Sequence, residues 1–110
     1  MKKINLPEIL KSVRTLDCVE LMQYFKMHNY KFWSWGARGF TNISNKALKF
    51  RVNGHHHKGH VYIVVNGMDL FDVYLTSIQG NIKTELNDIF IEDLFTILDE
   101  KIEKIPEYKS

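Results

Sequence analysis

The amino-acid sequence predicts an α+β fold: an antiparallel meander sheet of four or five strands, with N-terminal and C-terminal helices packed on one face. Three observations support this prediction. Apolar and polar residues alternate from Ala47 to Leu86, as in strands that bury one face. The turn signals Asn53-Gly54, Asn66-Gly67 and Gly80-Asn81 interrupt this stretch and favour tight hairpins. Segments with helical patterning lie on both sides of it.

We expect residues 1–110 to form a single domain. A chain of this length buries roughly 60–70% of its unfolded surface, which suffices for a core without a metal or a disulfide. Cys18 is the only cysteine, which excludes an intramolecular disulfide and favours a reducing, cytoplasmic compartment. We recognise no signal peptide and no run of about 20 apolar residues that could cross a membrane. The net charge of +2 does not by itself indicate nucleic-acid binding.

Two helices are predicted before the sheet. Asn5 and Glu8 form a capping box, in which the first side chain accepts from the backbone of the first helical turn. Asp17 and Glu20 repeat this spacing before a second apolar stripe. The predicted helices extend over residues 6–13 and from 17 to about 28.

The strands are predicted from composition and alternation. Tyr30 to Gly36 is rich in aromatic residues, which favours a strand. The glycines that follow predict an irregular loop over residues 36–45, which carries Arg38 and Phe40. Four further strands are predicted over residues 46–52, 59–65, 70–77 and 82–86.

The last helix is predicted from an apolar stripe that ends before Pro106. Glu92 and Asp93 in its first turn and Lys101 in its last turn match the helix dipole. The apolar residues of this helix share one face at helical spacing, and they are Ile91, Leu94, Phe95, Leu98, Ile102 and Ile105.

Alternation assigns the strand side chains to two faces. The face that accepts the helices is apolar and carries Leu48, Phe50, Val52, Val61, Ile63, Val65, Phe71, Val73 and Leu75. The opposite face is mixed and carries Lys49, Arg51, His60, Tyr62, Val64, Asp72, Tyr74, Thr76, Lys83 and Glu85.

A protein-binding surface is predicted at the end of the sheet that carries the histidine-rich hairpin, residues 55–60. Arginine and aromatic residues dominate interface hot spots, and the histidines add positive charge below pH about 6.5. An acidic partner protein suits such a surface. The predicted partner-binding residues are Arg38, Phe40, Lys49, Arg51, His55, His57 and Lys58.

The alternative is a nucleic-acid-binding module that uses the second face of the sheet. Tyr62 and Tyr74 would stack on bases, while Lys49 and Arg51 would neutralise phosphates. Asp72 reduces the positive charge of this face.

The two tryptophans, Trp33 and Trp35, fall on one face if their segment is a strand. Large aromatic side chains are seldom left exposed, so we expect both to complete the core, with an interface role as the alternative. The oligomeric state is left open between a monomer and a homodimer.

We expect a non-enzymatic protein without a metal or cofactor. The sequence contains no nucleophile elbow, phosphate-binding glycine loop or zinc-protease helix. Neighbouring strand residues point to opposite faces, so at most two imidazoles of the hairpin, His55 and His57, could converge on a metal.

The block that extends from Trp33–Gly36 through Asn66–Tyr74 to Leu98–Glu103 resembles small uncharacterised proteins carried by bacteriophages and bacterial mobile elements. The resemblance implies a small accessory or anti-defence protein that occludes a host protein, and it brings no catalytic residues. The order of helices and strands is also similar to double-stranded RNA-binding domains. Those domains present a lysine-rich start to the last helix, where this chain has acidic residues, so their function is not transferred.

Overall fold

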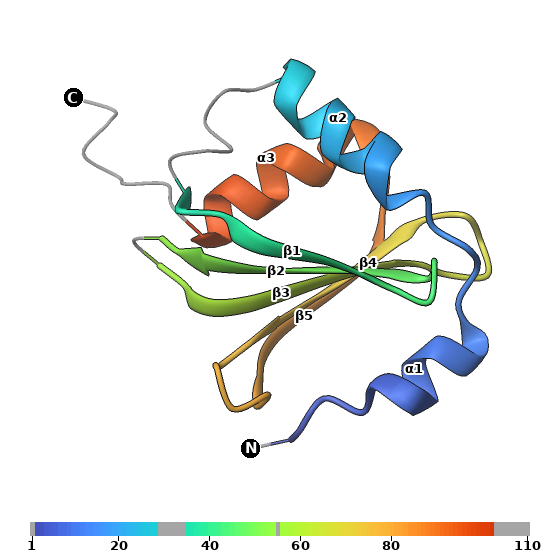
Figure 1. The fold of residues 1–110 in the computed structure, drawn as a ribbon, viewed down its shortest axis with the longest axis horizontal. Helices are drawn as coiled ribbons and strands as arrows, with labels where there is room; N and C mark the ends of the chain where they lie inside the picture. Colours follow the sequence, from blue (N-terminus) through green and yellow to red (C-terminus); the bar gives the residue numbers. More distant parts are fainter. Residues whose placement is uncertain (1, 29–34, 55, 103–110) are drawn as a thin grey trace.

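The structure is a computed structural model that describes residues 2–28, 35–54 and 56–102. These residues form one five-stranded antiparallel sheet and three helices. The strands follow the order β1-β2-β3-β4-β5, which confirms the α+β class and the meander (Figure 1). The helices are α1 (Leu6–Ser12), α2 (Cys18–His28) and α3 (Ile91–Ile102). The strands are β1 (Arg38–Ile43), β2 (Ala47–Asn53), β3 (Lys58–Val65), β4 (Phe71–Thr76) and β5 (Ile82–Ile89).

Strand β1 replaces most of the irregular loop predicted over residues 36–45. Gly39 adopts a φ of 68°, and the β1–β2 register shifts between Arg38 and Thr41. The glycine therefore forms a bulge within the strand instead of ending it. Ser44 and Asn45 both have positive φ, as in a type I′ hairpin turn, and join β1 directly to β2.

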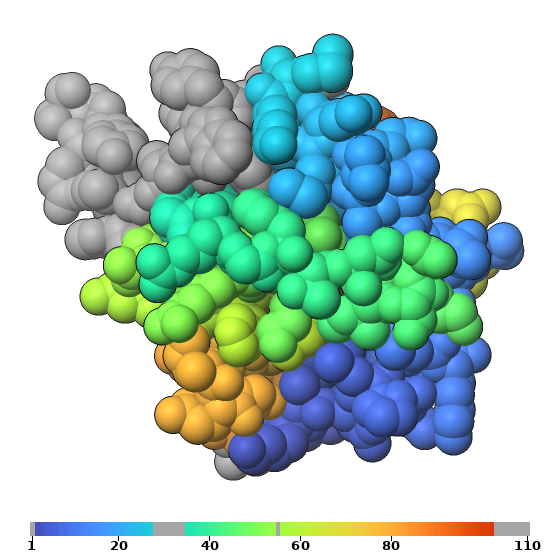
Figure 2. All heavy atoms as spheres, in the orientation of Figure 1, coloured from blue at the N-terminus to red at the C-terminus, as the bar shows by residue number. Residues whose placement is uncertain are grey.

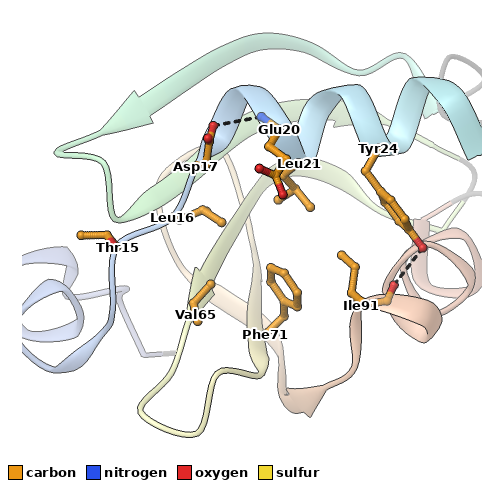
Figure 3. Close-up of a pocket in the computed structure, with 9 residues that line it drawn as sticks. All are labelled: Thr15, Leu16, Asp17, Glu20, Leu21, Tyr24, Val65, Phe71 and Ile91. Carbon is orange, nitrogen blue, oxygen red and sulfur yellow. Dashed lines mark hydrogen bonds between the residues drawn. The ribbon is translucent and has the colours of Figure 1, made fainter.

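The helices α2 and α3 cover one face of the sheet, as predicted (Figure 1). Both predicted N-caps form, since Asn5 accepts from the Glu8 amide and Asp17 accepts from the Glu20 amide. The Tyr24 hydroxyl of α2 donates to the Ile91 carbonyl at 3.3 Å and so links α2 to the start of α3 (Figure 3). The apolar stripe of α3 is buried at Leu94, Phe95, Leu98 and Ile102.

Trp35 lies at the centre of an aromatic cluster between the two helices. Its side chain has 0% exposed surface, stacks on Phe95 with ring centroids 4.8 Å apart, and meets Phe25 edge-on. Its indole Nε1 donates to Asp99 of α3 at 2.9 Å. Trp35 therefore belongs to the core, as predicted, although it lies in a turn and not in a strand. Residues 30–34, including Trp33, lie outside the described residues.

The short helix α1 departs from the prediction, because it lies against the opposite face of the sheet (Figure 1). The Lys46 ammonium donates to the Leu10 carbonyl at 3.1 Å, and the Ile4 amide donates to the Gly80 carbonyl at 2.8 Å. Figure 2 shows this N-terminal segment (dark blue) against the β1–β2 hairpin (green) and the β4–β5 hairpin (gold). Both faces of the sheet are therefore partly covered.

The C-terminal end of α3 docks on the β2–β3 hairpin. The amides of His56 and His57 donate to the Ile102 carbonyl at 2.7 and 3.3 Å, and so satisfy a carbonyl group that a helix end leaves without an internal partner. Gly54 lies directly beneath this contact. Of the described helices, none is long and apolar enough to cross a membrane.

The close approach of Gly54 to α3 yields a stability prediction. A Cβ atom at this position would collide with the carbonyl oxygen of Ile102, which belongs to backbone and cannot rotate away. We expect Gly54→Ala to lower the free energy of unfolding by about 1–3 kcal/mol, measured by urea denaturation.

Gly67 provides the matched control, because a Cβ added there meets nothing within 4 Å. We expect Gly67→Ala to change stability by less than about 0.5 kcal/mol. Equal losses in the two variants would contradict the docking of α3 on the hairpin.

Candidate functional site

Four cations lie together on the second face of the sheet, near the β2–β3 hairpin. We call these residues, Arg38, Lys49, Arg51 and Lys58, the cationic corner. Arg38 is directly opposite Arg51 across the β1–β2 ladder, so both side chains point to one face. Lys49 and Arg51 share that face by alternation, and Lys58 is opposite Asn53 on the same face. Lys49 is half-buried, and the other three side chains are exposed.

No carboxylate among the described residues neutralises this corner. The ion pairs of Lys11 with Glu8 and of Arg14 with Asp69 lie away from the corner. Glu85 shares a cross-strand row with Lys49, but it is three strand spacings of about 4.8 Å away. That separation exceeds the screening length of about 8 Å at physiological salt.

Two of the hairpin histidines, His57 and His60, add less positive charge than was predicted for them, because the structure lowers the pKa of both. His57 is only 5% exposed, and its Nε2 atom lies 3.2 Å from the carbonyl oxygen of His60. Burial lowers the pKa of His57, and burial followed by the charges of Lys49 and Arg51 lowers the pKa of His60. His57 is therefore an internal residue and not a surface contact. His55 lies outside the described residues.

Phe40 was also predicted as a partner contact, but the structure packs its ring against the core. Its ring is half-buried and stacks on Phe50 with centroids 5.0 Å apart. Since Phe50 has 0% exposed surface, the Phe40 ring points into the core layer and away from the cationic corner. The bulge at Gly39 produces this arrangement by changing the alternation of β1 next to Phe40.

The tyrosines of the second face are not an open stacking platform. Tyr62 is only 4% exposed, and the Lys49 ammonium lies 5.6 Å from its ring centroid. Tyr74 is half-buried and lines a groove of about 220 Å³ with Asn5 and Ile9 of the N-terminal segment. Burial, followed by the charges of Glu85 and Asp72, raises the pKa of Tyr74. The surroundings of Tyr74 therefore do not favour a phosphate.

The N-terminal segment is fastened across this face at both ends. At its start, Ile4 and Lys2 exchange backbone hydrogen bonds with Gly80 and Ile82. At its end, the Arg14 amide donates to the Val65 carbonyl at 2.8 Å.

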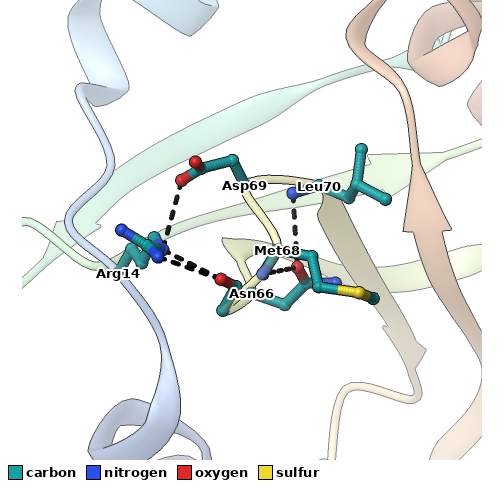
Figure 4. A network of polar contacts seen from close by, with 6 residues as sticks. Arg14, Asn66, Met68, Asp69 and Leu70 are labelled. Carbon is teal, nitrogen blue, oxygen red and sulfur yellow. Dashed lines mark hydrogen bonds and ion pairs between the residues drawn. The ribbon is translucent and has the colours of Figure 1, made fainter.

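The Arg14 side chain adds a second fastening at the β3–β4 turn (Figure 4). Its guanidinium donates to the Gly67 carbonyl and pairs with Asp69 at 3.1 Å. The side-chain oxygen of Asn66 accepts from the Met68 and Leu70 amides and so fixes the turn that presents these groups. This role of Arg14 was not predicted from the sequence.

The described residues provide little for metal binding or nucleophilic chemistry. No three histidine, cysteine or acidic residues among them are grouped as metal ligands would be. Cys18 is buried, and burial followed by the charge of Asp17 raises the pKa of its thiol, which favours the protonated form. The carboxylate of Asp72 accepts from the Asn66 side chain and from the Asp88 amide, so it has a structural role.

Comparison of the chain with protein-family models, with curated proteins and with solved structures gives no match. The resemblance to mobile-element proteins therefore stays a prediction.

The burial of His57 predicts a pH-dependent stability. Because its folded-state pKa is below the ordinary value of about 6.5, the unfolded chain binds more protons as the pH falls. We expect the free energy of unfolding to decrease from about pH 7 to about pH 5. We expect the substitution His57→Gln to reduce this decrease, because glutamine does not titrate but can still donate to the His60 carbonyl.

The control is His56→Gln, since the neighbouring His56 side chain is exposed. This variant is expected to retain the full pH dependence in urea titrations. A pH profile of His57→Gln that matches that of the unmodified chain would contradict the burial of this imidazole.

Proposed function

We propose that this chain is a non-enzymatic binding protein that occludes an acidic surface of another protein with its cationic corner. The observation that carries the proposal is the pairing of Arg38 directly opposite Arg51, with no carboxylate among the described residues beside them. Like charges opposite one another in a sheet are destabilising. Because the fold keeps this repulsive pair on an exposed edge, both guanidinium groups can pair with carboxylates of a partner.

Arginine is well suited to this role, because its planar guanidinium binds carboxylates through two parallel hydrogen bonds. The sheet holds Arg38 and Arg51 on adjacent strands, and Lys49 lies about 7 Å along β2 from Arg51. The strands therefore fix the backbone positions of these donors, and a preorganised backbone loses less entropy on binding than a loop does. If the chain is a mobile-element protein, the occluded partner is a host protein.

Binding of nucleic acid is the alternative, and it is less well supported. Base stacking requires open aromatic rings, whereas Tyr62 is almost fully buried. The side of the face that carries Tyr74 also bears Asp72 and Glu85. Phosphate contacts by the cationic corner alone would give non-specific, strongly salt-dependent affinity.

The double substitution Lys49→Glu/Arg51→Glu tests the role of the corner. The chain, immobilised and exposed to nuclease-treated lysate of the cells that produce it, is expected to retain an acidic protein at about 0.15 M salt. We expect the double variant to lose at least about tenfold of this affinity, because it reverses the charge at the centre of the contact.

The matched control is Lys11→Glu/Lys26→Glu, which changes the net charge equally at exposed positions of α1 and α2. This control is expected to retain the partner. Titration with single- and double-stranded oligonucleotides distinguishes the alternative. Tight oligonucleotide binding that only Lys49→Glu/Arg51→Glu abolishes, with no retained protein, would contradict the proposal.

We also expect the repulsion between Arg38 and Arg51 to lower the free energy of unfolding of the chain. The single substitution Arg51→Glu converts a repulsive cross-strand pair with Arg38 into an attractive one. We expect it to raise the free energy of unfolding by about 0.2–1 kcal/mol in urea denaturation at low salt while partner binding is lost. This gain in stability is expected to vanish near 1 M salt, where the screening length for charge–charge interactions falls to about 3 Å. A loss of stability in Arg51→Glu would show that the corner is structural.

A further inference from the structure

A second candidate site lies at the other end of β3, between α2, the sheet and the start of α3. A groove of about 310 Å³ lies at this place and is open to solvent (Figure 3). This volume is at the lower end of the range for ligand pockets, about 300–1,000 Å³. The residues that line it are Thr15, Leu16, Asp17, Glu20, Leu21, Tyr24, Val65, Phe71 and Ile91.

The floor and walls of the groove are apolar. Leu16 and Leu21 are buried parts of the core, whereas Val65, Phe71 and Ile91 are half-buried and keep part of their surface in the groove. In Figure 3 the side chains of these five residues surround a common space. Filling that space with an apolar side chain would remove more of this surface from water.

The rim of the groove is acidic, since the charged residues among the described ones that line it are Asp17 and Glu20. The Asp17 carboxylate caps α2 by accepting from the Glu20 amide at 3.0 Å, and the Glu20 side chain is exposed above Leu21 (Figure 3). Arg14 is near in sequence, but its guanidinium is held by the Gly67 carbonyl and by Asp69. The groove therefore combines an apolar interior with a rim that attracts cations.

We propose that this groove binds a segment of a partner protein that presents a large apolar side chain next to lysine or arginine. The apolar side chain would occupy the space over Val65 and Phe71, and the neighbouring cation would pair with Glu20 and Asp17. The site is separate from the cationic corner, since Val65 is seven residues, or about 23 Å, along β3 from Lys58. The chain would thus contact partners of opposite charge at its two ends.

Three short peptides test this proposal directly. The probe is N-acetylated, C-amidated Lys-Phe-Lys, and the comparison peptides are Glu-Phe-Glu and Lys-Gly-Lys with the same end groups. Titrations followed by backbone-amide NMR shifts are expected to locate the probe at residues 15–21, Val65 and Phe71. We expect both comparison peptides to bind at least about tenfold more weakly. Glu-Phe-Glu lacks the cations that would pair with the rim, and Lys-Gly-Lys lacks the apolar side chain that would fill the groove.

Equal binding of Glu-Phe-Glu would contradict the role of the rim, and equal binding of Lys-Gly-Lys would contradict the role of the apolar interior. Shifts of the same amides on raising the protein concentration without peptide would indicate that a second copy of the chain occupies the groove, which would overturn the proposal.

The variant Asp17→Asn/Glu20→Gln removes the rim charge and keeps the helix cap, because asparagine caps helices as well as aspartate does. We expect it to weaken binding of the Lys-Phe-Lys probe about three- to tenfold, in the range for two partly solvated ion pairs. The matched control is Glu92→Gln/Asp93→Asn, which removes two charges from the first turn of α3 without altering a groove-lining residue. This control is expected to change the affinity by less than about twofold.

Binding of the Lys-Phe-Lys probe to the groove does not depend on the proposed function of the cationic corner. The variant Lys49→Glu/Arg51→Glu, which lacks the cationic corner, is expected to bind the Lys-Phe-Lys probe as the unmodified chain does. A probe that binds the unmodified chain and Asp17→Asn/Glu20→Gln equally would overturn the groove proposal and leave the role of the corner untouched.

Discussion

Burial of β3 on both of its sides is the constraint on which the rest of this structure depends. Val61, Tyr62, Ile63 and Val64 are consecutive in the strand and at most 4% exposed. Because successive strand residues point to opposite faces, a single layer of helices cannot bury all four. The helices α2 and α3 cover one face, and the N-terminal segment with α1 lies across the other. Arg14 fastens one end of that segment at the β3–β4 turn, through its amide to Val65 and its side chain to Asp69.

With both faces partly covered, the two candidate contact surfaces lie at opposite ends of β3. At the hairpin end of β3 the exposed residues are cations held on adjacent strands, with Arg38 opposite Arg51. At the other end the rim residues Asp17 and Glu20 lie over an apolar groove. The two surfaces differ in charge and in shape, so we expect them to select different partners.

Much of the sheet could be predicted from the sequence because its signals are local. Apolar patterning and glycine-asparagine turn signals identify β2 to β5, and the Asp17 and Glu20 spacing marks the start of α2. The open second face was predicted wrongly, although a signal was present. The run Val61–Val65 is apolar without alternation, a pattern typical of strands buried on both faces. The docking of the β2–β3 hairpin, which carries the buried His57, on Ile102 joins residues far apart in the sequence, and no local pattern contains such a contact.

Amide hydrogen exchange of the N-terminal segment tests the central claim most directly. The amides of Ile4 and Arg14 donate to the carbonyls of Gly80 and Val65, so a segment docked across the second face protects both. We expect their protection to approach that of the β3 amides and to exceed that of an isolated seven-residue helix, which is marginal in water. Exchange of Ile4 and Arg14 at the rates of an unstructured peptide would contradict the account. Such rates would mean that the N-terminal segment leaves the second face, which would expose Tyr74 and favour the nucleic-acid alternative.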